Sequence, residues 1–171
     1  MKSISKILVV LLAITFASCD TNNMIAVLNP GAEDGTLTFV LNQPQNTNFT
    51  LLEENATTTM VTLTASQPDF GFRAAVIYYV EISFNADMSN RVTLGASVRG
   101  ATVPISVRDM NMGILGLYGG NMPNPVVARD VYVRLRAFVS ASRPSPLAPE
   151  PTVKPLFSNT IRFNILPYFV D

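Results

Sequence analysis

The side chains best able to do acid–base chemistry in this sequence are carboxylates, because its 171 residues include no histidine and a single cysteine. Without histidine, neither a Ser-His-Asp triad nor a histidine metal site can be built. Two carboxylates about 5 to 9 Å apart in a cleft would still support hydrolysis of a glycosidic bond. The acids considered for such a pair are Glu53, Glu54, Asp69, Asp87, Asp109 and Asp130. Because they lie in turns, at a helix start and at strand ends, we predict structural roles for them, no enzymatic activity, no cofactor and no metal.

The single cysteine lies where a secretory signal would be cleaved. A short basic start precedes the apolar run 7–16, which is too short to span a bilayer as a stop-transfer helix. Phe-Ala-Ser-Cys at 16–19 looks like a bacterial lipobox, in which the signal is cut before the cysteine and the thiol is acylated. We therefore predict a signal peptide over 1–18 and a lipidated Cys19 that begins a polar tether over 19–35. The alternative is an ordinary secreted protein whose cysteine carries no lipid.

Charge and length restrict the partners of the mature chain. Lys2 and Lys6 are two of the 12 basic residues, so the mature chain has 10 basic against 12 acidic side chains. This balance favours neither nucleic acid nor an anionic surface as partner. Membrane contact is expected through lipid alone, since two or three acyl chains at about 0.8 kcal/mol per buried methylene hold a protein on a bilayer. The remaining length is that of one domain.

Two stretches have the alternation of strong β-strands. In the first, within 69–84, one face carries Val76, Tyr78, Val80, Ile82 and Phe84, and the other carries Ile77, Tyr79, Glu81 and Ser83. In the second, over 130–140, Val131, Val133, Leu135, Ala137 and Val139 are predicted to face inward, and Tyr132, Arg134, Arg136 and Phe138 outward. A period of two is typical of half-buried strands. We expect the first of these strands to lie in the middle of a sheet.

The rest of the chain reads as short strands with one change of period. Further strands are predicted over 36–41, 49–52, 58–65, 91–98, 102–106 and 157–167, with Pro104 indicating a sheet edge. Residues 106–117 change to helical spacing and begin with Ser106 and Asp109, which resemble a capping box. The helix should be short and frayed, because Gly113 and Gly116 each cost about 1 kcal/mol relative to alanine. The predicted fold over 36–171 is an all-β sandwich of immunoglobulin or fibronectin III type, with about seven or eight strands.

Four local patterns, in this order, carry a resemblance to a known family. They are Leu-Leu-Glu-Glu-Asn-Ala at 51–56, Asp-Phe-Gly at 69–71 with the strand after it, Asp-Val-Tyr-Val-Arg-Leu-Arg-Ala at 130–137, and the stretch from Phe-Ser-Asn to Pro-Tyr at 157–168. Together with the lipobox they resemble the N-terminal immunoglobulin-like domain of SusE-type outer-membrane lipoproteins of gut Bacteroidetes, which belong to glycan-utilisation systems. The resemblance implies a protein on the outer membrane, exposed at the cell surface.

Two departures from that family bear on structure and function. Family members have a tryptophan before the Asp-aromatic-Gly loop, where this chain has Ala65 and Ser66, so Phe70 or Phe72 should fill the space. Members also continue beyond the Pro-Tyr end into glycan-binding modules, whereas only residues 169–171 follow here. The resemblance therefore implies a spacer or accessory domain, with glycan binding inherited by association.

Direct sugar binding would need exposed planar rings with polar groups beside them. The candidate rings are Tyr79, Tyr132 and Phe138 on outward strand faces, Tyr118 in a Gly-rich loop, and Phe157 after a Pro-rich loop. Cross-strand aromatic pairing is the alternative role for them. Beside these rings, Arg134 and Arg136 form either a partner-binding stripe or solvated edge charges.

The Pro-rich loop within 142–155 is expected to be extended and to contact a protein partner. Its candidate contact residues are Pro144, Pro146, Pro149 and Pro151. Three hypotheses stay open: an accessory or scaffold lipoprotein of a glycan-uptake system, a carbohydrate-binding lipoprotein, and an adhesin or pilus-like subunit. The expected partners are the membrane through lipid, a polysaccharide, and an outer-membrane transporter or neighbouring lipoproteins.

Overall fold

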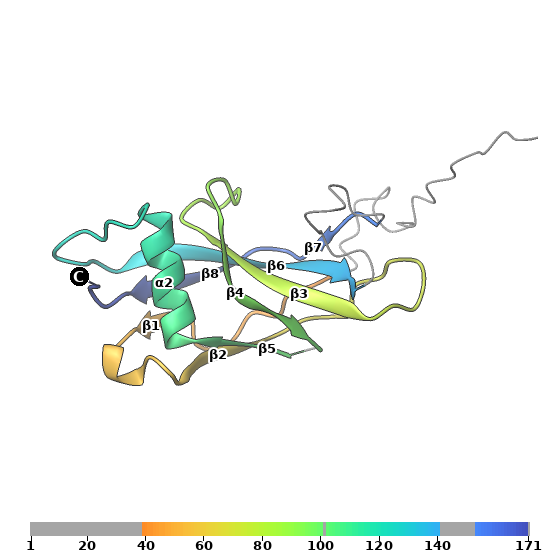
Figure 1. Ribbon diagram of the computed structural model, residues 1–171, viewed down its shortest axis with the longest axis horizontal. Coiled ribbons are helices and arrows are strands. Elements are labelled where there is room, and N and C mark those ends of the chain that lie inside the picture. The colour runs from red at the N-terminus through yellow and green to blue at the C-terminus, as the bar shows by residue number, and fades with distance from the viewer. Residues whose placement is uncertain (1–38, 101, 141–152, 171) are drawn as a thin grey trace, which may run out of the picture.

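The computed structural model describes residues 39–100, 102–140 and 153–170. Within these ranges the chain folds as an all-β sandwich with a single α-helix, as predicted (Figure 1). The strands are β1 (Asn48–Thr50), β2 (Thr59–Thr64), β3 (Val76–Ser83), β4 (Val92–Arg99), β5 (Thr102–Ser106), β6 (Arg129–Val139), β7 (Leu156–Phe157) and β8 (Ile161–Leu166). The helices are the 3₁₀ turn η1 (Glu53–Asn55) and α2 (Val107–Leu117). The predictions for the signal peptide, Cys19, the tether and the prolines at 144–151 concern residues outside the described ranges.

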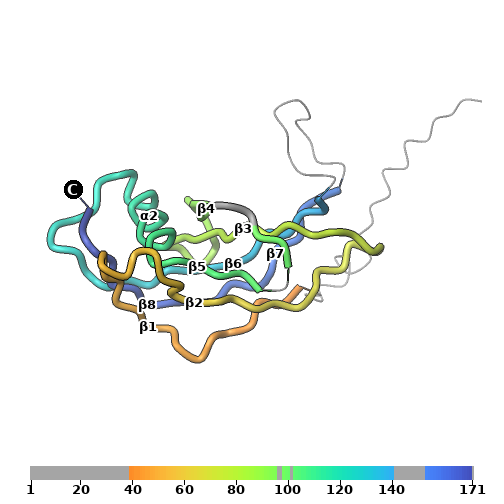
Figure 2. The backbone as a smooth tube through the Cα atoms, turned by 60° about the horizontal axis from the view of Figure 1, so that its bottom comes forward, coloured from red at the N-terminus to blue at the C-terminus, as the bar shows by residue number. Residues whose placement is uncertain are grey.

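The strands form a large sheet and a small one. The large sheet has the order β1-β8-β6-β3-β4, with β7 also paired to β6, and the small sheet consists of β2 and β5. β1 runs parallel to β8, and the other pairs are antiparallel. The small sheet lies beside the large one as a second layer (Figure 2). β5 contains Pro104 and pairs only with β2 among the described strands, in agreement with the predicted edge position.

β3 lies between β6 and β4, in the interior of the large sheet, as its pattern predicts. Its inner face packs with that of β6, because Val80 pairs with Leu135 and Ile82 pairs with Val133. Residues of the small sheet close the core from the other side. The largest fully buried side chains include Phe39, Phe70, Phe163, Leu41, Leu63, Ile82, Met110, Ile114, Leu135 and Ile165. Of the two rings expected to replace the missing tryptophan, Phe70 is buried, whereas Phe72 is 42% exposed.

The helix α2 begins at the predicted cap and is regular over its 11 residues. The hydroxyl oxygen of Ser106 accepts a hydrogen bond from the Asp109 amide at 3.0 Å, and the hydroxyl donates to the Asp109 carboxylate at 2.7 Å. Gly113 allows close packing: a Cβ atom there would lie 2.2 Å from Leu94 Cδ2 and 2.8 Å from Ile82 Cδ1. Among the described residues, no helix combines the length and apolar character needed to cross a bilayer.

Two strand predictions need correction, and a side-chain amide explains the first. In the described part of 36–41 there is no strand; Leu41 forms only an isolated bridge with Ala65. On the other side of Leu41, the side chain of Asn159 takes the place of a neighbouring strand: it accepts from the Leu41 amide at 2.7 Å and donates to the Leu41 carbonyl at 3.1 Å. The strand predicted over 157–167 is divided into β7 and β8. Between them the Ser158 hydroxyl oxygen accepts from the Leu135 amide at 2.9 Å, which takes the place of a ladder bond.

Candidate functional site

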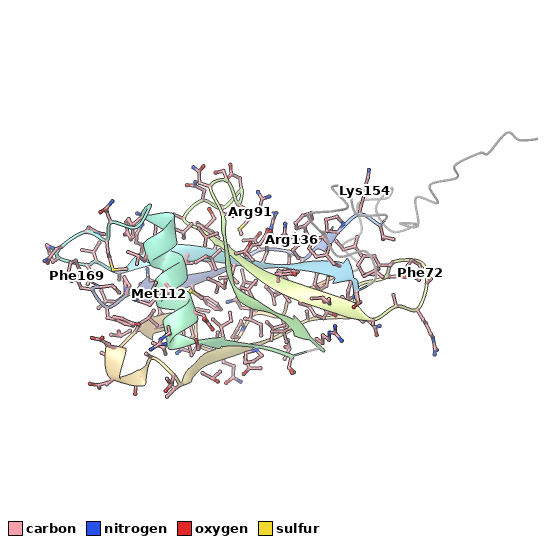
Figure 3. The ribbon with its side chains drawn as sticks, in the orientation of Figure 1. Phe72, Arg91, Met112, Arg136, Lys154 and Phe169 are labelled. Atoms are coloured by element: carbon pink, nitrogen blue, oxygen red, sulfur yellow. The ribbon has the colours of Figure 1, made fainter. Side chains whose placement is uncertain are left out.

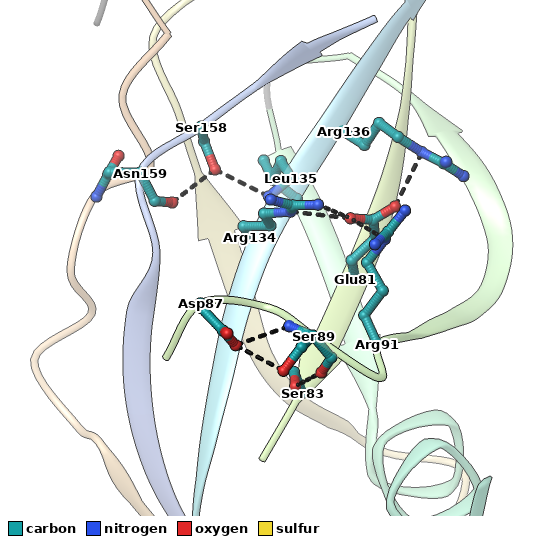
Figure 4. A network of polar contacts seen from close by, with 10 residues as sticks. All are labelled: Glu81, Ser83, Asp87, Ser89, Arg91, Arg134, Leu135, Arg136, Ser158 and Asn159. Carbon is teal, nitrogen blue, oxygen red and sulfur yellow. Dashed lines mark hydrogen bonds and ion pairs between the residues drawn. The ribbon is translucent and has the colours of Figure 1, made fainter. Parts of the chain in front are cut away.

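A buried glutamate on the outer face of the large sheet has three arginines around it. Glu81 of β3 lies directly opposite Arg134 of β6. Arg136, two residues further along β6, is the diagonal neighbour of Glu81. From the other side, Glu81 pairs with Thr93 of β4, and Arg91 precedes Thr93 by two residues. Because opposite and diagonal residues on one face of an antiparallel sheet reach each other, the register brings these charges together. We call Glu81, Arg91, Arg134 and Arg136 the Glu81 cluster (Figure 4).

The carboxylate of Glu81 contacts all three guanidinium groups. Its Oε2 lies 2.8 Å from Arg134 Nη2, 2.9 Å from Arg134 Nε and 3.3 Å from Arg91 Nε. Its Oε1 lies 3.1 Å from Arg136 Nε. The glutamate side chain is 0% exposed, whereas those of Arg91, Arg134 and Arg136 are 46%, 18% and 26% exposed. A buried carboxylate needs such compensation, and removing its partners would leave an uncompensated charge that costs about 3–5 kcal/mol.

The cluster keeps unused hydrogen-bonding capacity. The contact between Arg136 Nε and Glu81 Oε1 is an ion pair without hydrogen-bond geometry. Among the described residues, the terminal nitrogens of Arg91 and Arg136 take part in no ion pair or hydrogen bond. Each guanidinium has five N–H donors, and three positive charges face one negative charge. The cluster is therefore a fixed site with a surplus of positive charge and of donors.

Aromatic rings flank two of the three arginines, Arg134 and Arg136. Arg134 Cζ lies 4.3 Å from the ring centroid of Phe157, which is 37% exposed. Arg136 Cζ lies 5.0 Å from the Phe138 centroid and 5.6 Å from the Tyr79 centroid. These distances are those of cation–π contacts, which hold the guanidinium groups in place. The arginines are thus ordered by rings and by a carboxylate, and the interpretation as solvated edge charges is wrong.

The structure divides the five predicted sugar-binding rings. Phe157 and Tyr79 lie at the Glu81 cluster, but Phe138 is only 3% exposed, so its expected exposure on the outward face is wrong. The reason is its edge-on packing against Tyr79, with ring centroids 5.6 Å apart at 88°. Tyr132 lies on β6 opposite Ser83 and is half-buried.

Tyr118 lies in a different cluster from the other predicted rings. Its ring centroid is 4.9 Å from that of Phe84, and Arg129 Cζ is 3.9 Å from the Phe84 centroid. Arg129 also donates a 3.5 Å hydrogen bond to the Tyr118 hydroxyl. Tyr118 therefore packs within this group and is half-buried.

Three of the acidic candidates accept hydrogen bonds within turns, at a helix start or at a strand end, as predicted. The Asp109 carboxylate, in the first turn of α2, accepts from the Ser106 cap hydroxyl, and Asp130 accepts from Asn164 at 3.0 Å and from Arg162 at 3.4 Å. Asp87 accepts from the Ser89 amide at 2.9 Å and from its hydroxyl at 2.7 Å. These hydrogen bonds, that of the Ser89 amide first, lower the pKa of the Asp87 carboxyl below its ordinary 3.8.

An open groove of about 650 Å³ lies along the loop before β3, lined by Gln67, Pro68, Asp69, Gly71, Phe72, Arg73 and Ala74. Asp69 accepts from the Gly71 amide at 2.7 Å, which shapes the turn. Phe72 lies at one end of the molecule and Phe169 at the other, whereas Arg91 and Arg136 lie between them (Figure 3). The groove and the Glu81 cluster are therefore separate features.

Sequence reasoning missed Glu81 and Arg91 as site residues and Phe72 as an exposed ring. The available signal for Glu81 was a carboxylate in the middle of the most apolar strand. A charge at such a place requires cationic neighbours. Which arginines supply them depends on the strand register, and sequence alternation alone does not give that register.

Comparison with family models matches residues 22–136 to the model described as SusE outer membrane protein, more than half of the chain. The chain belongs to the SusE outer membrane protein family. This SusE-family chain is thus an outer membrane protein of the kind found in glycan-utilisation systems, as the resemblance implied. The matched segment includes all four residues of the Glu81 cluster and ends at Arg136, so Phe157 lies outside it. No solved structure matches the chain.

Proposed function

We propose that this SusE-family protein is a non-enzymatic, lipid-anchored accessory component of a glycan-uptake system at the cell surface. The observation that carries this proposal is the engagement of Glu81, Asp109 and Asp130 in structural contacts. Glu81 is enclosed by arginines, Asp109 accepts from the hydroxyl of the Ser106 cap, and Asp130 is bonded to two β8 side chains. A glycosidase instead keeps two carboxyl groups free in a cleft, one of them able to donate a proton. Family membership supplies the outer-membrane and glycan context.

The lipid anchor is tested by replacing Cys19 with serine. Acylation of the thiol is expected to place the wild-type chain in the membrane fraction and to label it with radioactive palmitate. The Cys19→Ser variant should lose the label and the membrane association together. Palmitate labelling that persists in Cys19→Ser would refute the anchor. Protease treatment of intact cells then tests surface exposure, since only a chain on the outer side is digested.

The accessory role is tested in a strain that lacks the protein. We expect slower growth on one or more polysaccharides and normal growth on the corresponding monosaccharides, because uptake and not metabolism is impaired. The purified full-length protein should release no reducing ends from the same polysaccharides. Release of reducing ends, lost on substituting one of the acids, would make the protein a glycosidase and contradict the proposal.

Contact with a transporter or a neighbouring lipoprotein is proposed for the prolines at 144, 146, 149 and 151. A short polyproline segment loses little conformational entropy when it binds. Replacement of residues 144–151 by a Gly-Ser sequence of equal length should abolish co-purification of the partner after mild crosslinking. Retention of every partner would show that the loop has another role.

A second candidate function, direct carbohydrate binding, is favoured by the exposed ring of Phe157. Aromatic rings with polar groups beside them are the usual platform for a sugar face. Calorimetric titration with a polysaccharide panel should give saturable heat that Phe157→Ala reduces. The matched control is Phe169→Ala, which removes a ring of similar exposure, 39%, at one end of the molecule and away from Arg136 (Figure 3).

A further inference from the structure

We infer that the Glu81 cluster, with Phe157 beside it, binds the carboxylates of an acidic, uronate-containing polysaccharide. This inference rests on the proposed function in glycan uptake and adds the site and the chemical class of the glycan. It differs from sugar stacking alone, because the arginines select for charge on the sugar.

The surplus of positive charge is the first observation behind it. One buried carboxylate requires about one cation, yet Glu81 has three within 3.3 Å. The arginine with the most contacts, Arg134, approaches Oε2 through both Nε and Nη2. Arg91 and Arg136 each use only Nε, and their remaining N–H groups are the ones available to a ligand. The Glu81 side chain is fully buried, whereas those of Arg91 and Arg136 are 46% and 26% exposed, so part of each arginine side chain remains accessible to a ligand.

The geometry of the donors suits a carboxylate. A guanidinium presents parallel N–H groups that match the two oxygens of a carboxylate, and such charge-assisted pairs are stronger than neutral hydrogen bonds. The cluster already binds one carboxylate, that of Glu81, at 2.8 to 3.3 Å. Cation–π contacts with Phe157, Phe138 and Tyr79 hold Arg134 and Arg136 in place, so a ligand bound by Arg136 has less side-chain entropy to remove.

The neighbouring ring favours a glycan over an acidic peptide. Phe157 pairs with Arg136 on the strand ladder and lies next to Arg134, so an exposed planar surface adjoins the charged groups. A uronate unit has an apolar ring face for Phe157 and a carboxylate for Arg91 or Arg136 on one residue. A run of acidic peptide side chains supplies the charge but no matching ring face.

The test is calorimetric titration of the full-length lipoprotein in detergent with galacturonan oligosaccharides. Fully methyl-esterified galacturonan, with the same backbone and no charge, is the matched ligand control. Dextran sulfate, soluble starch and polyglutamate represent sulfate esters, neutral glycans and acidic peptides. We expect saturable binding of galacturonan alone, weakened as salt rises because the contact is partly screened.

Three variants locate the site. Arg91→Ala should weaken galacturonan binding on the order of tenfold, because a hydrogen bond to a charged group is lost, while Glu81 keeps two arginines. Phe157→Ala should weaken it several-fold. Arg162→Ala is the control: it removes an arginine of the same sheet that is 65% exposed and paired with Asp130, outside the cluster. Circular dichroism of each variant checks that the fold is retained.

Several results would overturn the inference. They are no binding of galacturonan, equal binding of its methyl ester, and an equal loss in Arg91→Ala and Arg162→Ala. Tighter binding of polyglutamate would assign the cluster to an acidic protein partner, and preference for dextran sulfate would assign it to sulfate esters. A strain carrying Arg91→Ala separates this inference from the proposed function. Unimpaired growth on galacturonan in that strain, with slow growth only after deletion of the whole protein, contradicts the site and leaves the accessory role intact.

Discussion

The two glycines of α2 should respond in opposite directions to the same substitution. Alanine is favoured over glycine in a helix interior by about 0.8–1.0 kcal/mol; this full gain applies at Gly113, and a smaller one applies at Gly116, the last residue but one of α2. At Gly116 a Cβ atom would lie 3.5 Å from both methyl groups of Val92, which is an ordinary contact. Gly116→Ala is therefore expected to raise the free energy of unfolding by up to about 1 kcal/mol.

At Gly113 the packing against the sheet opposes that gain. The added carbon would lie 2.2 Å from Leu94 Cδ2 and 2.8 Å from Ile82 Cδ1, whereas carbon atoms in contact are about 3.5–4.0 Å apart. Both neighbours are buried, at 5% and 0% exposure, so they move only by displacing other core residues. Overpacking of this kind costs about 1–3 kcal/mol, and the net change for Gly113→Ala is a loss of up to about 2 kcal/mol.

Urea unfolding followed by far-ultraviolet circular dichroism measures the difference directly. With a slope of about 2 kcal/mol per molar urea, the two variants should move the midpoint in opposite directions by several tenths of a molar. Because helix propensity favours alanine in both variants, a loss of stability in Gly113→Ala reports the packing against the sheet. If Gly113→Ala were as stabilising as Gly116→Ala, the close approach of α2 to β3 and β4 would not constrain the glycine.

Three further predictions concern hydrogen bonds and titrating groups. Asn111 is buried, and its side chain accepts from the Tyr168 amide at 3.0 Å and donates to the Tyr168 carbonyl at 3.1 Å. Asn111→Ala should therefore lower the free energy of unfolding in urea by about 1–3 kcal/mol and speed proteolysis near Tyr168. Unchanged stability and proteolysis would contradict this prediction. Because the pKa of the Asp87 carboxyl is lowered, its contribution to stability is present above pH 3.8 and is lost as the pH falls through the folded-state pKa. Carbon-13 NMR titration of Asp87 should give a midpoint below 3.8, and Ser89→Ala should raise that midpoint. A midpoint at or above 3.8 in the wild-type protein would refute this prediction. Burial raises the pKa of the Tyr78 phenol above 10.0, so its contribution to stability is complete below pH 10 and is lost as the pH rises through the folded-state pKa. Tyr78→Phe should therefore reduce the loss of stability at alkaline pH. An identical loss in both proteins would show that Tyr78 does not cause it.

The sequence predicted those parts of the fold that depend on local pattern. The alternation over β3 and β6 gave their inward residues, and the Ser106 cap gave the start of α2. Both signals are local, since a strand face and a capping residue are each specified within a few positions. The hydrogen bonds of Leu41 with the Asn159 side chain were not predictable in this way, because the two residues are 118 positions apart in the sequence.

The candidate site was harder to predict than the fold for a related reason. The alternation along β6 predicted that Arg134 and Arg136 face outward, but their ion pairs are made with Glu81 of the neighbouring strand β3. Exposure of Phe138 was mispredicted because its cover comes from Tyr79 across the strand pair. Such contacts between strands depend on register, whereas the alternation of each strand is the same for several registers.

The parallel pairing of β1 with β8 sets an order of events in folding. Asn48 pairs with Asn164, so a strand near the start of the domain finds its partner only near the end of the chain. A polypeptide that emerges from its N-terminus first has β1 and Leu41 available long before β8 and Asn159. Contacts between such distant residues also close slowly, because a long loop must be ordered first. The domain therefore completes its sandwich only after synthesis of its last strand, and until then β1 and Leu41 lack the partners that hold them in the folded protein.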